Sequence, residues 1–274
     1  MVTFTRYADV VAVLNDSRFE VPPVPAAGAG IDMRWLRATV PRFSNGDLHA
    51  VRRADVVAEL DRLNPRTLRT SAAETARSVA VEEVAVWVLA AALGIAAPVY
   101  DDVQAVAAVY LTGEPDERAD VAVLNLVRAF GGAADERTAA RISLLIQACT
   151  ATATLIDNSL RAWQAWRPDC DVAALVLETL RHDPPVPVIR RVVVAPARIG
   201  GVDVPAGVPV LLDLKRANRD PEVFADPDRF VPGRPTAHLT FGAGIRPCPG
   251  RDHAVAIAVG AVETAISRTP TPVV

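Results

Sequence analysis

Hydrophobic positions along this chain repeat mostly with the period of an α-helix. From about residue 48 to residue 166, apolar side chains recur at spacings of three and four, which is the pattern of helices that bury a face. The longest such pattern begins at the acidic pair Asp135 and Glu136, which suits a helix N-terminus. It should end near Pro168, because proline cannot continue a helix.

Shorter helices are predicted before and after this block. Residues 5–14 form a short amphipathic pattern. Residues 171–181 form another, which Pro184 and Pro185 should stop. A last helix is expected over about residues 251–266, where small and apolar residues dominate.

The pattern takes on a β character after residue 190. Short valine-rich runs alternate with glycine turns between residues 192 and 212, which predicts a small antiparallel sheet. A segment rich in proline and aspartate follows over residues 220–235. No segment looks like a linker, so we expect a single domain over residues 1–274 that is mainly α with a small β region.

Composition narrows the class of protein. The 274 residues carry a net charge of only -3 and no basic patch, so nucleic acid is not an expected partner. Three cysteines give no disulfide framework, which fits a reducing cytosol. The most apolar run, residues 84–99, is shorter than the roughly 20 residues that span a bilayer. The N-terminus lacks a signal-peptide pattern, and we expect a cytoplasmic protein with no membrane partner.

The strongest chemical signal is a cysteine in a loop of glycine and proline, over residues 241–250. The predicted helix after this loop would offer free N–H groups and partial positive charge, which favour an ionised sulfur. Glycines let the backbone approach a flat ligand closely. Arg246 is placed to meet an anion. The alternative is a plain cysteine in a surface turn.

This run resembles the haem-thiolate signature of the cytochrome P450 family. All five fixed positions of that signature match, at Phe241, Gly244, Arg246, Cys248 and Gly250. The resemblance implies a cytochrome P450-like fold with haem b as cofactor and Cys248 as the ligand of its iron. It also implies that Phe241, Gly242, Arg246 and Gly250 help to bind the haem.

Two further motifs support the resemblance. Glu178 and Arg181 lie at positions i and i+3 of a predicted helix, where side chains can pair. The family completes such a pair with an arginine from a later Pro-x-Arg-Phe element, which Arg229 matches here. The resemblance implies a buried charge network that supports the cysteine loop; the alternative is a solvated surface pair.

Further cationic partners for the haem propionates are expected from other segments. Arg191 fits the family's position before the first β-run better than Arg190 does. His49 and Arg53 match a His-x-x-x-Arg element near a helix start; an ordinary exposed helix is the alternative. His238 also fits the family pattern, and we interpret it as structural.

The long helix departs from the family. The resemblance would place an acid and an alcohol over the iron, and the aligned positions here hold Thr150 and Ala151. No carboxylate remains to relay protons. Thr150, Thr152 and Gln147 are the candidate catalytic residues, and simple packing is the alternative reading of the threonines.

The chain is shorter than a typical member. Relative to the family it looks trimmed at the N-terminus, in the lid region and at the C-terminus, which predicts an open distal pocket. We expect a monooxygenase-like oxidation of a small molecule in a bacterial biosynthetic pathway, with electrons from an external ferredoxin or reductase. Alternatives are a peroxide-using or redox-neutral haem enzyme, and a non-catalytic haem-binding partner protein.

Overall fold

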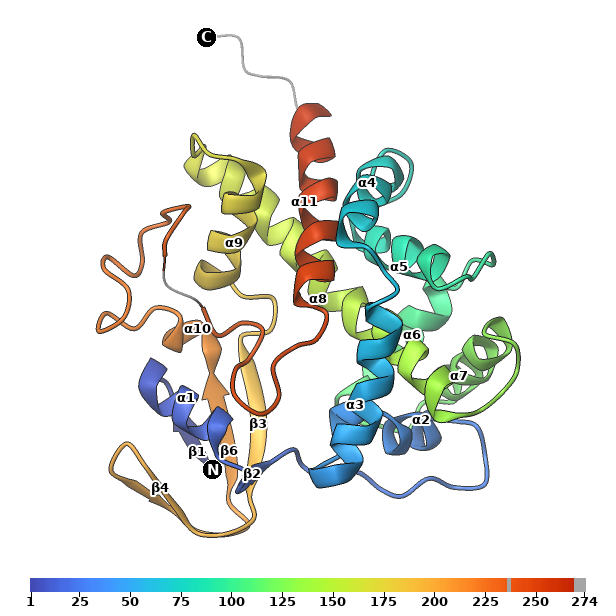
Figure 1. The fold of residues 1–274 in the computed structure, drawn as a ribbon, viewed down its shortest axis with the longest axis horizontal. Coiled ribbons are helices and arrows are strands. Elements are labelled where there is room, and N and C mark those ends of the chain that lie inside the picture. Colours follow the sequence, from blue (N-terminus) through green and yellow to red (C-terminus); the bar gives the residue numbers. More distant parts are fainter. Residues whose placement is uncertain (236–237, 269–274) are drawn as a thin grey trace. The chain divides into compact units, whose positions relative to one another are not determined.

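The computed structural model describes residues 1–235 and 238–268 (Figure 1). The chain divides into two compact units, each built from two separate stretches of sequence. The first unit contains Met1–Pro22 and Arg161–Arg251, and the second contains Pro23–Leu160 and the chain from Asp252 onward. The single domain expected over residues 1–274 stays a prediction.

The first unit is built around a sheet of four strands in the order β1-β6-β3-β2. Strand β1 pairs parallel with β6, and the other pairings are antiparallel. Strands β4 and β5 form a separate hairpin. The elements of this unit are β1 (Val2–Phe4), α1 (Tyr7–Asn15), β2 (Phe19–Glu20), α9 (Val172–His182), β3 (Val188–Val193), β4 (Ala197–Ile199), β5 (Val202–Val204), β6 (Pro209–Asp213) and α10 (Leu214–Ala217).

The sheet corrects the sequence-based expectation in one respect. The strands between residues 188 and 213 are antiparallel as expected, but the N-terminal strands β1 and β2 also join the sheet. Val2 pairs with Val210 and Phe4 with Leu212. Runs of two or three residues carry too little periodicity to be predicted, and only their distant partners make them strands.

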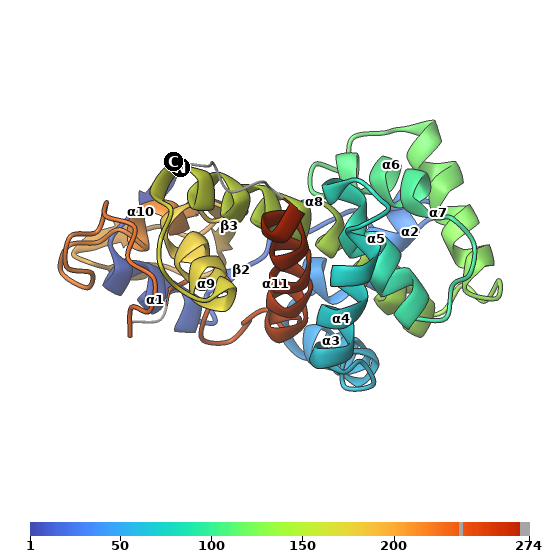
Figure 2. The ribbon, with the colours of Figure 1, turned by 90° about the horizontal axis from the view of Figure 1, so that it is seen from above.

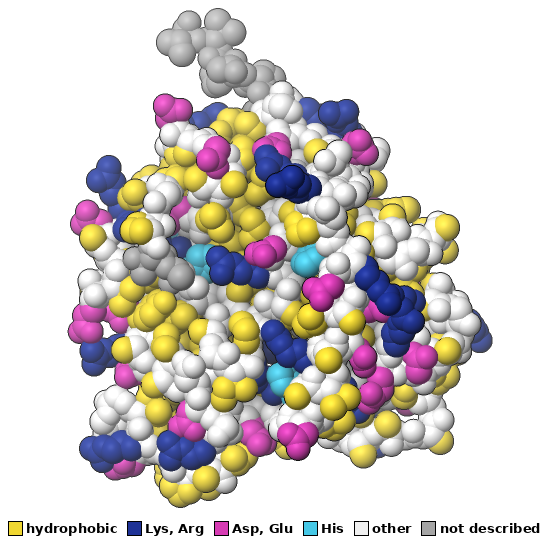
Figure 3. Space-filling model, in the orientation of Figure 1, with side chains coloured by type: hydrophobic (Ala, Val, Ile, Leu, Met, Phe, Trp, Pro, Cys, Tyr) yellow, Lys and Arg dark blue, Asp and Glu magenta, His cyan; other side chains and the backbone are white. Residues whose placement is uncertain are grey.

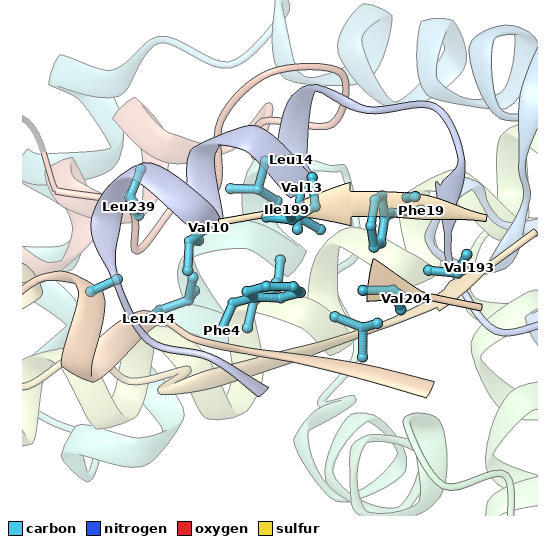
Figure 4. Packing of buried hydrophobic residues seen from close by; sticks show 14 residues of the cluster. Phe4, Val10, Val13, Leu14, Phe19, Val193, Ile199, Val204, Leu214 and Leu239 are labelled. Carbon is cyan, nitrogen blue, oxygen red and sulfur yellow. The ribbon is translucent and has the colours of Figure 1, made fainter. Parts of the chain in front are cut away.

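Packing between the sheet and α1 forms the core of the first unit, seen in Figure 4. Val10, Val13 and Leu14 lie on one face of α1 and are buried, as their helical spacing predicts. Phe4 and Leu212 of the paired strands β1 and β6 pack in the same cluster. The cluster fixes α1 against the sheet, and the end of α1 in turn receives the cysteine loop.

The second unit is helical. Several helices begin with an aspartate or asparagine whose side chain accepts a hydrogen bond from the first turn, as Asp32, Asn64 and Asp116 do. The elements are α2 (Met33–Thr39), η1 (Pro41–Phe43), α3 (Gly46–Leu60), α4 (Pro65–Thr75), α5 (Val81–Ala92), α6 (Tyr100–Tyr110), α7 (Glu117–Ala129), most of α8 (Glu136–Trp166) and nearly all of α11 (Arg251–Arg268). Figure 2 shows α5, α6 and α7 gathered beside one another.

Helix α8 confirms the predicted long helix, and its last turns belong to the first unit. By length and composition it is the one helix in the described part of the chain that could cross a membrane. Its most apolar window is 56% buried inside the structure, and the core helix of a globular protein has the same properties.

Helix α11 packs closely on α4. The close approach is shown by Gly260, where an added Cβ would lie 2.1 Å from the Arg69 carbonyl oxygen.

Candidate functional site

The cysteine loop is closed by its own backbone. The Cys248 N–H donates to the Phe241 carbonyl at 2.7 Å, and the Gly242 N–H donates to the Leu239 carbonyl at 2.7 Å. Gly242 has φ +70°, a conformation that favours glycine. The closure leaves the Cys248 side chain exposed, so its sulfur is accessible to a ligand.

The loop is also held against the end of α1. The Ile245 N–H donates to the Leu14 carbonyl at 3.1 Å. Carbonyls in the last turn of a helix have no partner within the helix, so Leu14 offers a ready acceptor. Gly244 has φ +64°, and a Cβ there would lie 2.4 Å from the same oxygen. Only glycine allows this approach.

A buried charge network lies between α9 and the segment before the loop. Arg181 donates to Glu178 through Nε at 3.0 Å and Nη2 at 2.7 Å, and both side chains are 2% exposed. Arg181 also donates to the carbonyls of Asn218, Pro227 and Arg229. The buried Arg181 guanidinium depends on these partners, because a buried charge that loses its partner strongly destabilises the fold.

The arginine that completes this network is Arg234, not Arg229 as the sequence motif suggested. The Arg234 Nε lies 3.3 Å from Glu178 Oε1, and its guanidinium also donates to the carbonyls of Ala225, Asp226 and Arg229. Arg229 contributes its carbonyl oxygen, while its residue is exposed. The motif gave the correct segment, but the side chain that contacts Glu178 and the carbonyls of that segment is Arg234.

Asn218, at the end of α10, links this network to the cysteine loop. Its side chain accepts from the Leu239 N–H at 2.7 Å and donates to the Thr240 hydroxyl at 2.9 Å. The Thr240 hydroxyl donates to the Leu180 carbonyl at 2.6 Å. Asn218 is fully buried. Sequence reasoning missed it, because a single asparagine after a short helix carries no motif.

His238 stands at the base of the loop. Its Nδ1 accepts from the Thr240 N–H at 3.3 Å, and its Nε2 is buried without a partner among the described residues. Burial, with a smaller contribution from the charge of Arg251, lowers the pKa of His238 to about 4. The ring is therefore neutral near pH 7, which agrees with the structural role expected for it.

The predicted haem-binding residues fall into two sets, one in each unit. Arg191, in β3, is buried at 6% exposure and donates to the Arg190 carbonyl at 2.8 Å. It shares the first unit with the residues of the cysteine loop. His49 and Arg53 lie one turn apart on α3 in the second unit. The haem contacts of all these residues stay predictions.

Helix α3 is anchored to α8 by a buried carboxylate. Glu59 accepts from Arg137 Nε at 2.7 Å and from Arg141 Nε at 2.9 Å. Burial opposes ionisation, but the two arginines outweigh it and hold the pKa of Glu59 below its usual value. The clamp fixes the helix that carries His49 and Arg53.

The three candidate catalytic residues lie on two sides of α8. Gln147 and Thr150 are exposed and one turn apart, so they share a face. Thr152 is 2% exposed and lies on the buried side. Its burial matches the packing alternative, while Gln147 and Thr150 are accessible to a ligand. Their catalytic roles stay predictions.

These residues fit a haem. The accessible Cys248 sulfur suits an axial ligand of iron, and the two glycines with positive φ leave no side chain on the backbone beside it. Within the first unit, Cys248 would hold the iron, and Arg246 and Arg191 would meet the propionates.

Comparisons with known proteins agree with this geometry. The family model described as Cytochrome P450 matches residues 172–257. The erythromycin C-12 hydroxylase of Saccharopolyspora erythraea is 36% identical over 140 residues, which cover 46% of this chain and 35% of that protein. Protein DesVIII of Streptomyces venezuelae is 41% identical over 138 residues, 43% of this chain and 34% of that protein. The chain thus spans about a third of the length of the curated relatives it matches.

Solved structures share the fold over almost the whole chain. P450BioI, in complex with an acyl carrier protein, matches with a TM-score of 0.80 and 24% identity, covering 98% of this chain and 85% of that chain. A cytochrome P450 from Sulfolobus tokodaii matches with a TM-score of 0.80 and 23% identity, covering 96% and 85%. The chain therefore has the fold of cytochrome P450 structures, and residues 172–257 match the family model of that name.

Proposed function

We propose that this chain is a haem-thiolate oxidoreductase that oxidises a small molecule in a bacterial biosynthetic pathway. The observation that carries the proposal is the exposed Cys248 thiol on a loop fixed at Phe241 and Leu14. The similarity to an erythromycin C-12 hydroxylase supports the reaction class and the type of pathway. A cytoplasmic location and an external ferredoxin or reductase as electron donor belong to the same proposal.

Each part of the chain has a defined task in this function. When bound, haem supplies the oxidation chemistry, and a thiolate ligand favours O–O cleavage. The two backbone hydrogen bonds within the loop fix the main chain that carries the Cys248 sulfur. The Glu178, Arg181 and Arg234 network fixes the segment from which that loop emerges. Gln147 and Thr150 would face the ligand side of α8 and orient a water molecule there.

The proposal is tested by the absorption spectrum of the reduced, carbon monoxide-treated haem protein. The unmodified chain and a Cys170→Ser control, which alters another exposed cysteine, should both give the red-shifted Soret band of a thiolate ligand. Cys248→Ser should lose it. A histidine-type band in the unmodified chain, or a thiolate-type band that survives in Cys248→Ser, would contradict the proposal.

A second candidate is a haem enzyme that uses peroxide or runs a redox-neutral rearrangement, dehydration or cyclisation. It is favoured by the accessible face of α8, where Thr150 stands in place of a carboxylate. The double variant Thr150→Asp with Ala151→Thr restores an acid and an alcohol. It should raise dioxygen uptake driven by an added ferredoxin and its reductase if the chain is a weakened monooxygenase. Unchanged uptake, with peroxide-driven oxidation of a phenolic reporter retained, would favour the second candidate.

A further inference from the structure

A hollow of about 460 Å³, lined by four cationic side chains and by the carboxylates of Asp220 and Asp228, lies on the first unit, apart from the cysteine loop. Its walls come from two segments that are far apart in sequence, the turn between β1 and α1 and the stretch from α10 to residue 228. Figure 1 shows α1 beside α10. Four cationic side chains line the hollow, namely those of Arg6, Lys215, Arg216 and Arg219.

The two walls are held together by Asp220, which is 8% exposed. One carboxylate oxygen of Asp220 accepts from the Tyr7 N–H at 2.8 Å, and the other accepts from the Glu222 N–H at 3.0 Å. Both oxygens are engaged with backbone donors. Asp220 therefore serves to position the walls, and the hollow is built into the fold.

Most of the cations in the hollow form only exposed ion pairs or none. Arg6 pairs with Glu222 and Lys215 with Asp183, in pairs whose side chains are 42% exposed or more. Such exposed pairs contribute little stability, so a ligand can recruit these cations. Arg216 is exposed, and its guanidinium has no hydrogen-bonded or ionic partner among the described residues.

Arg219 supplies a fixed donor in the same hollow. Its Nη2 donates to the His182 carbonyl at 2.6 Å and its Nε donates to the same oxygen at 3.1 Å. Asp228 lies 3.1 Å from Nη1 and is 82% exposed. The guanidinium is thus oriented by the His182 carbonyl at the end of α9, while its ionic partner is an exposed surface carboxylate.

We propose that this hollow binds the phosphate group of a small molecule. Four cations on two walls outnumber the two carboxylates of the lining, which favours an oxyanion as ligand, and arginine suits phosphate geometry. The volume lies in the range of small-ligand sites. Figure 3 shows basic and acidic side chains mixed over the surface facing the viewer. With a net charge of -3, the chain offers no extended basic field for a nucleic acid. This proposal is independent of the haem chemistry.

The test is a calorimetric titration of the haem-loaded protein with inorganic pyrophosphate at constant ionic strength and pH 7. The expected result is saturable binding at one site per chain, with no such signal from chloride. Adenosine 5′-diphosphate is titrated in parallel, because tighter binding than that of pyrophosphate would identify a nucleotide as the source of the phosphate. Equal heats for pyrophosphate and chloride would overturn the proposal.

Variants locate the binding. Arg216→Ala and Arg6→Ala should each weaken pyrophosphate binding roughly tenfold, the loss expected for one charge-assisted contact. The matched control is Arg198→Ala, an exposed arginine of the same unit that pairs with Asp203 away from the hollow. Affinity lost equally in Arg198→Ala, or retained in both hollow variants, would overturn the assignment. Far-ultraviolet circular dichroism verifies that each variant is folded.

Discussion

Glu178 and Arg181 form an ion pair that is sealed from solvent, with two hydrogen bonds of 3.0 and 2.7 Å between them. The two residues lie one turn apart on α9, and Arg181 also donates hydrogen bonds to carbonyls much later in the sequence, those of Asn218 and Arg229. The Val231 N–H also donates to Glu178, at 2.8 Å. The pair therefore ties the irregular segment before the cysteine loop to a regular helix.

The first prediction separates Arg234 from Arg229. Arg234→Gln should lower the free energy of unfolding by about 2–4 kcal/mol, because it removes the charge beside buried Glu178 and frees three carbonyls. Arg229→Gln should change it by no more than about 0.5 kcal/mol, since its side chain is exposed. Urea unfolding of both variants measures this. The reverse order of effects would restore Arg229 as the member of the network.

The second prediction concerns the contact of Gly244 with Leu14. Gly244→Ala adds a Cβ at 2.4 Å from the Leu14 carbonyl oxygen as well as strain at φ +64°. Gly233→Ala is the matched control, because it has φ +84° and nothing within 4 Å of the added carbon. In both variants, backbone strain should lower the free energy of unfolding by about 1 kcal/mol. Gly244→Ala should lose about 1–3 kcal/mol more, from overpacking.

The same pair of variants reports on the cysteine loop. Gly244→Ala should reduce the fraction of thiolate-type Soret band in the reduced, carbon monoxide-treated protein, because Leu14 helps to hold the loop. Gly233→Ala should leave that fraction unchanged. Equal stability and equal spectra in the two variants would show that the loop can move away from α1 at little cost.

The third prediction is a pH dependence that originates at His238. The pKa of this residue is about 4 in the folded chain and about 6.5 in an unfolded one. Between those values the unfolded state binds more protons, so stability falls as the pH falls from about 6.5 to about 4. The contribution of His238 over that window is at most about 3 kcal/mol.

Replacement of His238 by asparagine tests this assignment, because the asparagine oxygen can still accept from the Thr240 N–H. Denaturation should be compared for the two proteins at pH 8 and at pH 4.5. The difference in stability between the two pH values should shrink in His238→Asn. If both proteins lose the same stability on acidification, other groups are responsible for the pH dependence.

The fourth prediction concerns Tyr110, at the end of α6. The residue is 2% exposed, and its hydroxyl is buried without a partner among the described residues. Burial also raises the pKa of the Tyr110 phenol. Removal of an unsatisfied buried polar group is favourable, so Tyr110→Phe should raise the free energy of unfolding by about 1 kcal/mol.

Tyr100→Phe, at the start of the same helix, is the control for that change. The residue is only partly buried, and its hydroxyl lies 3.5 Å from Gln104 Nε2 in an exposed contact, so the effect should stay within about 0.5 kcal/mol. Thermal unfolding followed by circular dichroism compares the two. A clear loss of stability in Tyr110→Phe would show that a bound water satisfies the hydroxyl.

Much of the helical fold could be predicted from the sequence, because helices are local. The apolar spacing and acidic start that marked a helix after Asp135 correspond to α8, and Asp171 caps α9 where that helix was expected to begin. The cysteine loop was also predictable, since its glycines, arginine and cysteine are adjacent in the chain. These features depend on backbone preferences and on the spacing of nearby residues, both of which can be read from the sequence.

Only the tertiary structure decided the features that depend on distant partners. Strand β1 has three residues and exists through its pairing with β6. The choice of Arg234 over Arg229 depends on how residues 225–234 fold back against Glu178 of α9. Asn218 became visible as a support of the cysteine loop only once Leu239 and Thr240 lay beside it. Local periodicity determined most of the helices and a local motif determined the cysteine loop, whereas long-range packing and buried hydrogen bonds determined which side chains hold that loop in place.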